Sequence, residues 1–235
     1  MKTKILFLSL LLATSLRAQT VDELIQKYEA ARGGAKLKAL KSVVLTGAMS
    51  MGDMQAPMKI TKSRPDHFRM DFKFGDATAT QAFDGVTAWS TQPGTPGAVK
   101  MTGDDMVAVR DQADFDGPLV DYKRKGNTLE LIGKADLDGK PAYKLKLKTK
   151  SGEETMVYLD AATYLEVRDE VKRKVDGQDI ESETSISGYR EVEGVRFATR
   201  VEAKLKSGDA VPAVFTIDKI ELNPKFEPDV FAMPK

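Results

Sequence analysis

Apolar and polar residues alternate along most of this chain, and this period of two constrains its fold more than any other feature. The pattern is clearest in residues 67–74, 143–148 and 195–206. In the first run, one face carries Phe68, Met70, Phe72 and Phe74, and the other carries His67, Arg69, Asp71 and Lys73. A strand with one apolar and one hydrophilic face is typical of an antiparallel sheet that covers a core on one side.

Further strand-like runs are separated by turn residues such as Gly52-Asp53, Asp84-Gly85 and Asp138-Gly139. These runs are residues 42–51, 55–64, 77–84, 86–91, 127–137, 154–160, 163–175, 179–190 and 213–223. A sheet of roughly a dozen strands is too long to stay flat, so it should curl into a barrel or part of one. The predicted fold class is therefore mainly β with a few helices, built on a curved antiparallel sheet.

A helix is predicted where the period changes after residue 18. Its apolar residues recur at helical spacing and are Val21, Leu24, Ile25 and Tyr28. Asp22 and Glu23 lie at its N-terminal end, where the helix dipole favours acidic side chains. Gly33-Gly34 should end this helix, and residues 35–41 predict one or two further turns.

Residues 92–122 interrupt the run of strands. Asp104 and Asp105 are expected to cap a short helix that carries Met106, Val107 and Val109. An insertion of this length between strands is often a lid or a binding loop. A helical plug that closes one end of the core explains the same pattern equally well.

Residues 1–18 have the pattern of a secretory signal peptide. Lys2 and Lys4 precede the apolar run of residues 5–12, which is shorter than the about 20 residues that a membrane-spanning helix needs. A small-residue cleavage region ends at Ala18. We therefore expect export to the periplasm, with residues 19–235 forming a single domain. Because no Cys follows the apolar run, we expect a soluble protein without a lipid anchor.

Composition excludes several kinds of partner and site. Three of the 36 basic residues lie in the leader, so the remaining 33 nearly balance the 35 acidic residues. This balance predicts no nucleic-acid partner. The chain has no Cys, which rules out disulfides, thiol nucleophiles and Cys-ligated metals.

No pattern of residues points to catalysis. The one histidine, His67, lies on the hydrophilic phase of its strand and is expected at the surface. Without a second His or a Cys, a transition-metal site lacks its usual ligands. The acidic pairs Glu153-Glu154 and Asp104-Asp105 fall in a turn and at a helix start, and neither a G-x-S-x-G nor a phosphate-binding motif is present. We expect no enzyme and no cofactor or metal, although an all-oxygen Ca²⁺ site stays open.

Methionines are concentrated in the early strands and in the interrupting segment. They are Met49, Met51, Met54, Met58, Met70, Met101 and Met106. Flexible, polarizable Met side chains suit a surface that adapts to an irregular apolar guest. An ordinary core that uses Met explains them as well.

Three motifs carry a resemblance to a known family. Residues 63–70 (SRPDHFRM) have the form R-P-x-x-F-x-Met, and residues 81–89 (QAFDGVTAW) have the form D-G-x-x-x-W. The chain ends with FEPDVFAMP at residues 226–234. In this order the motifs resemble the periplasmic lipoprotein carriers of the LolA/LolB-like superfamily, and in particular the outer-membrane lipoprotein-sorting branch.

The resemblance implies an incomplete, half-open barrel whose open side is covered by helices around an apolar cavity. It also implies that Arg64, directly before Pro65, helps to hold the helices that act as a lid. The side chains proposed to line the cavity are Phe68, Met70, Phe72, Phe83, Trp89 and Met106. Any one of them could instead belong to an ordinary core, because alternation shows only which residues of one strand share a face.

The function that the resemblance implies is a periplasmic carrier. It would hold acyl chains of lipoproteins or of other lipids for transport toward the outer membrane. It would act as a monomer between membrane-bound donor and acceptor proteins. The main alternative is a non-catalytic lipid or lipoprotein sensor, or a protein-interaction module, whose cavity is small or filled. A hydrolase of envelope lipids would need a polar reactive cluster inside the cavity.

Overall fold

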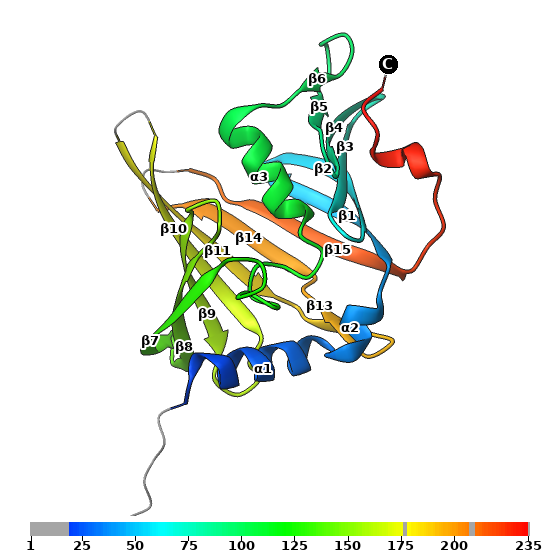
Figure 1. Ribbon diagram of the computed structural model, residues 1–235. Helices are drawn as coiled ribbons and strands as arrows, with labels where there is room; N and C mark the ends of the chain where they lie inside the picture. Colours follow the sequence, from blue (N-terminus) through cyan, green and yellow to red (C-terminus); the bar gives the residue numbers. More distant parts are fainter. Residues whose placement is uncertain (1–18, 176–177, 207–209, 235) are drawn as a thin grey trace, which may run out of the picture.

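The computed structural model describes residues 19–175, 178–206 and 210–234. The predicted signal peptide, residues 1–18, lies outside them. Within these ranges three α-helices and one 3-10 helix accompany a long antiparallel sheet (Figure 1). No helix in this part of the chain is both long and apolar enough to cross a membrane.

The main sheet has 13 strands, and neighbouring strands are antiparallel. From one edge to the other they are β6 (Val99–Lys100), β5 (Ala88–Thr91), β4 (Ala77–Asp84), β3 (His67–Phe74), β2 (Met54–Ser63), β1 (Ser42–Met51), β15 (Ala213–Leu222), β14 (Arg200–Leu205), β11 (Gln178–Ser187), β10 (Glu166–Val175), β9 (Glu154–Asp160), β8 (Lys140–Lys148) and β7 (Thr128–Leu137). The sheet curves, but its edge strands β6 and β7 do not pair, so the predicted incomplete barrel is confirmed (Figure 1).

A bulge in β15, where Asp218 has no register partner on β1, contributes to this curvature. The register between β1 and β15 shifts between Thr46 and Gly47. A Cβ atom at Gly47 would lie 1.8 Å from the main-chain oxygen of Thr216. Only glycine therefore allows the two strands to approach here, and bulges of this kind bend a sheet and increase its twist.

Residues in register across the strands share a face of the sheet. Phe68 pairs with Lys62 and Phe83, and Lys62 pairs with Val43. In the other half of the sheet, Asp169 pairs with Val157, which pairs with Leu145. These residues lie on the face that packs against the helices, which we call the inner face. The opposite face is the outer face.

Helix α1 (Val21–Arg32) covers the inner face at the β7–β9 end of the sheet. A capping box of Thr20 and Glu23 begins it, and Gly33 ends it with a positive φ of 124°. It buries Leu24, Ile25 and Tyr28, as the helical spacing predicts. The core cluster that they join also contains Leu119, Val120, Tyr122, Leu145, Leu147, Val157 and Leu159.

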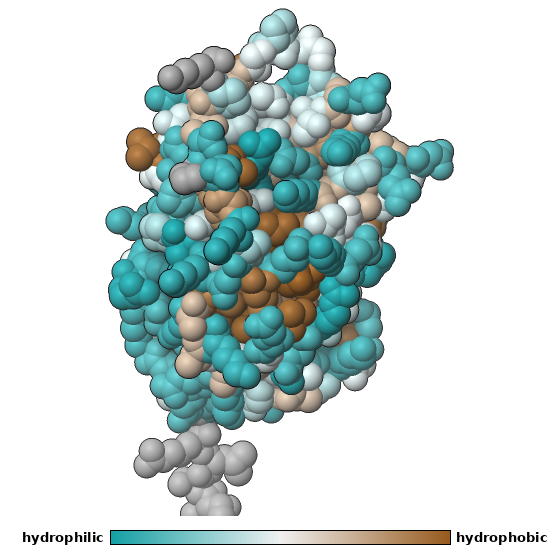
Figure 2. Space-filling model, turned by 90° about the vertical axis from the view of Figure 1, so that its right-hand side faces the viewer, coloured by the Kyte–Doolittle hydropathy of each residue, from teal (hydrophilic) through white to brown (hydrophobic). Residues whose placement is uncertain are grey.

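A second cluster surrounds the short helix α2 (Ala35–Ala39) and contains Leu37, Leu40, Val43, Phe115 and Val195. Figure 2 shows the side of the molecule on which α2 and the C-terminal segment lie. Hydrophilic side chains cover most of this side, and apolar side chains gather in its middle.

The run of residues 195–206, predicted as one strand, is two strands in different sheets. β12 (Arg190–Val192) pairs with β13 (Val195–Phe197) in a small hairpin, whereas β14 joins the main sheet. The chain turns at Thr199, whose amide donates to Ser187 and whose carbonyl accepts from Ile217. Alternation continues across this turn, so the period alone does not reveal the break.

Helix α3 (Gly103–Ala113) packs on the inner face of β3, β4 and β5. Its N-cap is Thr102 rather than Asp104 or Asp105, which lie in its first turn. Its buried residues are Val109 and Ala113. A 3-10 helix, η1 (Pro228–Phe231), contacts β3 and β4 near the C-terminus.

Candidate ligand-binding site

The inner face beneath α3 is apolar. Phe68, Phe83 and Ala88 from the sheet pack with Val109 and Ala113 from α3. Partly buried residues around this cluster are Ile60, Met70, Met101 and Met106. The structure therefore brings together four of the six side chains proposed to line a cavity, namely Phe68, Met70, Phe83 and Met106. Packing against the helix agrees with the plug interpretation of residues 92–122, and movement of α3 as a lid stays a prediction.

Phe72 lies on the inner face, farther along β3, in register with Met58 and Ala79. It is only partly buried. Trp89 does not belong with the others, because it pairs with Ala82 and so lies on the outer face. Its indole N–H donates to the carbonyl of Phe231 at 2.8 Å. The proposal that Trp89 lines an inner cavity is thus incorrect.

The C-terminal segment, residues 223–234, covers this part of the outer face. Phe231 is buried, and its ring centroid lies 5.2 Å from that of His67. Arg69 donates to the carbonyl of Val230 at 2.9 Å. His67 is half-buried, and its Nδ1 atom is buried without a hydrogen-bond partner. The expectation that His67 is an exposed surface residue is wrong, because a segment distant in sequence covers it.

Arg64 joins the end of α2 to the connection between α3 and β7, and both segments border the inner face. Its Nε donates to the carbonyl of Leu40 at 2.6 Å, and its Nη2 donates to that of Leu37 at 3.2 Å. Both carbonyls lie at the C-terminal end of α2. The same guanidinium forms a bidentate pair with Asp116, at 2.7 and 2.5 Å. It also lies 4.5 Å from the ring centroid of Phe115. A planar, five-donor guanidinium can make all of these contacts at once, which a lysine cannot do.

Two lysines hold the same connection between α3 and β7. Lys125 donates to both carboxylate oxygens of Asp114 at 2.7 Å and to the carbonyl of Gly117 at 2.8 Å. Lys62, on the inner face of β2, donates to the carbonyl of Asp114 at 3.0 Å. Burial lowers the pKa of the Lys62 ammonium to about 8, although nearby Asp114 favours the charged form.

Sequence reasoning did not identify Lys62 as a site residue, but a signal for it was present. On β2 the inner-face residues are Met54, Ala56, Met58, Ile60 and Lys62. A lysine in phase with four apolar residues is the anomaly that points to it.

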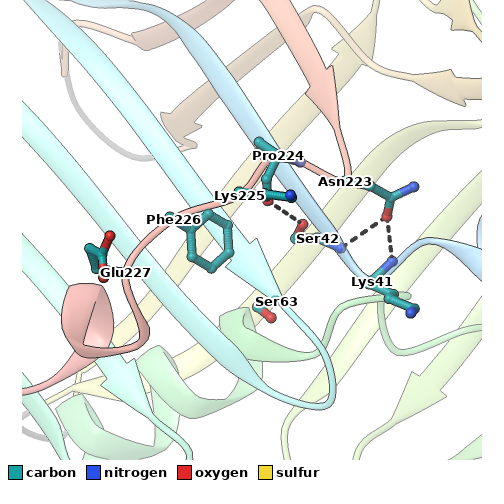
Figure 3. Close-up of a pocket in the computed structure, with 8 residues that line it drawn as sticks. All are labelled: Lys41, Ser42, Ser63, Asn223, Pro224, Lys225, Phe226 and Glu227. Atoms are coloured by element: carbon teal, nitrogen blue, oxygen red, sulfur yellow. Dashed lines mark hydrogen bonds between the residues drawn. The ribbon is translucent and has the colours of Figure 1, made fainter.

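A polar groove lies beside the connection between α3 and β7. Its volume is about 770 Å³, and its walls include Arg64, Arg110, Asp114, Asp116 and Lys125. A second groove, of about 580 Å³, lies between the start of β1 and the C-terminal segment (Figure 3). There the side chain of Asn223 accepts hydrogen bonds from the amides of Lys41 and Ser42. Both grooves carry charged side chains, and an apolar cavity on the inner face stays a prediction.

A buried polar group lies at the other end of the inner face. A bulge between Glu166 and Arg168 turns Glu166 and Asp169 toward the same side of the sheet. Burial raises the pKa of Asp169 well above its usual value, and the neighbouring carboxylate of Glu166 raises it further. Its Oδ1 has no hydrogen-bond partner. Tyr189 donates its hydroxyl to the carbonyl of Glu166, and burial raises the pKa of this Tyr.

Within the described ranges, no group of three or more His, Asp or Glu side chains is placed to hold a metal ion.

The curved sheet with its covering helices recurs in solved structures, including the following three. A LolA superfamily protein from Nitrosomonas europaea aligns with a TM-score of 0.63 at 13% identity, over 92% of this chain and 98% of that one. The chain described in this structure therefore has the LolA fold. A domain from Vibrio parahaemolyticus, described as an outer membrane lipoprotein-sorting protein, aligns with a TM-score of 0.66 at 10% identity, over 91% and 97% of the two chains.

The third is a DUF1329 family protein from Desulfovibrio piger, with a TM-score of 0.66 at 12% identity, over 91% of this chain and 98% of that one. The resemblance read from the motifs is thus confirmed at the level of the fold. No protein-family model matches the sequence, and no curated protein matches it. At these identities the likeness concerns the fold alone.

Proposed function

We propose that this protein is an exported periplasmic carrier that binds acyl chains of lipoproteins or other lipids. It would bind them on the inner face of its LolA-fold sheet and deliver them toward the outer membrane. The observation that carries the proposal is the contact network of Arg64. This one side chain ties the end of α2 to Asp116, in the connection that follows α3 over the apolar inner face.

Physical chemistry supports a closable site. Transfer of an acyl chain of ~16 carbons out of water gains on the order of 10 kcal/mol before ordering costs. A static site with that affinity would release its ligand too slowly for a carrier. Release then requires that α3 and the connection after it move, and Arg64 restrains the connection.

An alternative is a sensor or interaction module with the same fold. The packing of Val109 and Ala113 against Phe68 and Phe83 favours it, because the protein's own side chains occupy the inner face there. Such a module would bind a protein partner and no acyl chain.

The test is the exchange of a bound acyl ligand in Arg64→Leu. The protein is purified gently from periplasm, its bound masses are measured by native mass spectrometry, and release of a fluorescent acyl probe is timed. We expect a co-purifying acylated molecule in the wild type. We expect probe exchange to be about 10-fold faster or more in Arg64→Leu, because several charge-assisted hydrogen bonds are lost. Asp116→Asn keeps the side-chain size and should change exchange in the same direction.

Arg69→Leu is the matched control. Arg69 also bonds a main-chain carbonyl and a carboxylate, but it holds the C-terminal segment on the outer face. Arg69→Leu should therefore leave exchange of the acyl probe unchanged. An empty wild-type protein that also refuses acyl probes would favour the sensor module. Equal exchange in the wild type and both site variants would remove Arg64 from the mechanism.

A further inference from the structure

Lys62 occupies an unusual position for a lysine. Its register partners are Val43 on β1 and Phe68 on β3, which are both buried apolar residues. Its ammonium lies 5.9 Å from the ring centroid of Phe68 and beneath the backbone of Asp114. A methionine or leucine would fit the same pattern without the cost of removing a charge from water.

The hydrogen-bonding capacity of this ammonium is only partly used. An ammonium has three donors, and among the described residues the ammonium of Lys62 makes one hydrogen bond, to the main-chain carbonyl of Asp114. The carboxylates nearest to it already have partners, since Asp114 pairs with Lys125 and Asp116 pairs with Arg64. Because its pKa is about 8, the group is still mostly protonated at pH 7.

The charges around Lys62 favour an incoming anion. Arg32 and Lys125 lie close enough to lower its pKa, and Asp114 and Asp116 act in the opposite direction. Arg32 bonds the hydroxyl of Tyr28 and a main-chain carbonyl, and it has no carboxylate salt bridge within the described residues. An anion near Lys62 would therefore meet an ammonium with free donors and a second cation nearby.

An apolar path leads away from this ammonium along the sheet. On the inner face of β2, Lys62 is followed by Ile60, Met58, Ala56 and Met54. Eight residues of strand span ~26 Å, which exceeds the ~15 Å that the acyl chains of one lipid leaflet span. Met54 at the far end is 37% exposed, whereas Met58 is 2% exposed. This row of side chains thus runs from the partly buried Lys62 to the exposed Met54.

We propose that Lys62 binds the anionic head of an acyl ligand, a carboxylate or a phosphate, whose chain lies along the inner face of β2. The inference rests on the proposed function and adds the class of ligand to it. The connection between α3 and β7, which carries Asp114, covers Lys62. Arg64 and Lys125 hold this connection through Asp116 and Asp114, so they also control access to the Lys62 ammonium.

The experiment compares a 16-carbon fatty acid with the alcohol of the same chain length, both below their aggregation concentrations. Binding to the mature protein is measured by displacement of a fluorescent acyl probe at pH 7. We expect the acid to bind about 10-fold tighter than the alcohol, and Lys62→Met to abolish this difference, because the acid then has no cationic partner for its carboxylate. Lys62→Arg should keep the preference for the acid. A monoacyl phosphate in the same assay distinguishes the two anionic heads.

Lys59→Met is the control, since Lys59 lies on the same strand but on the outer face, where it is exposed. If the acid and the alcohol bind equally well to the wild type, the role of Lys62 is overturned while the acyl carrier stands. If Lys59→Met weakens binding of the acid as much as Lys62→Met does, the effect comes from general surface charge and the inference fails. If neither ligand binds, the proposed function itself fails.

Discussion

At the residue scale, Asp169 shows how a buried ionisable group ties stability to pH. Its carboxyl lies beside Glu166 with one oxygen unpartnered, and burial raises its pKa well above the usual 3.8. Below pH 3.8 the group is protonated in both folded and unfolded chains and has no effect on stability. Above that pH the unfolded chain ionises first, so stability falls until the pH passes the raised folded-state pKa.

We therefore predict that Asp169→Asn is more stable than the wild type at pH 7, by roughly 1–3 kcal/mol. The difference should vanish toward pH 3.8, and urea unfolding at a series of pH values measures it. Asp160→Asn is the control, because Asp160 accepts three hydrogen bonds from Ala162 and Thr163 and has a lowered pKa. Its substitution should destabilise the protein at pH 7. An Asp169→Asn variant less stable than the wild type at pH 7 would contradict this account.

At the element scale, the C-terminal segment behaves as a strap over the outer face of β3–β5. Phe231 is its anchor: the side chain is 4% exposed, and its carbonyl accepts the indole N–H of Trp89. We predict that Phe231→Ala costs about 3 kcal/mol of stability, the usual range for a buried phenylalanine. Because Trp89 is the one tryptophan, its emission should also shift to the red.

Phe226→Ala provides the comparison within the same segment. Phe226 contacts the ring of Phe231 edge-on but is only partly buried. Phe226→Ala should therefore shift the emission of Trp89 less than Phe231→Ala does. Unchanged emission in Phe231→Ala would mean that the strap does not depend on this anchor.

At the scale of the whole molecule, the connection between α3 and β7 links the two ends of the sheet. Phe115 packs in the cluster around α2, whereas Leu119, Val120 and Tyr122 pack against α1. We predict that residues 19–235 unfold as one cooperative unit. Trp89 fluorescence reports one end of the sheet and far-UV circular dichroism reports all strands, so the two urea curves should coincide. A separate early transition in fluorescence would divide the chain into two units.

Much of the fold was predictable because its signals are local. The period of two located most strands of the main sheet, and helical spacing located α1 with its buried Leu24, Ile25 and Tyr28. The number of strands implied a sheet that must curl. The dipeptide Arg64-Pro65, through its resemblance to a family motif, directed attention to a side chain with contacts in two other segments.

The sequence alone determined which side chains of each strand share a face, since alternation is a property of the extended backbone itself. Only the tertiary structure decided what covers each face. Trp89 and His67 lie under a segment whose hydrogen bond to Trp89 spans 142 residues, and no local period encodes such a contact. The partial burial of Lys62 likewise follows from the path of the connection at Asp114, 52 residues away. Contacts at such separations form only when the whole chain packs, and they set the charges and apolar surfaces of the candidate site.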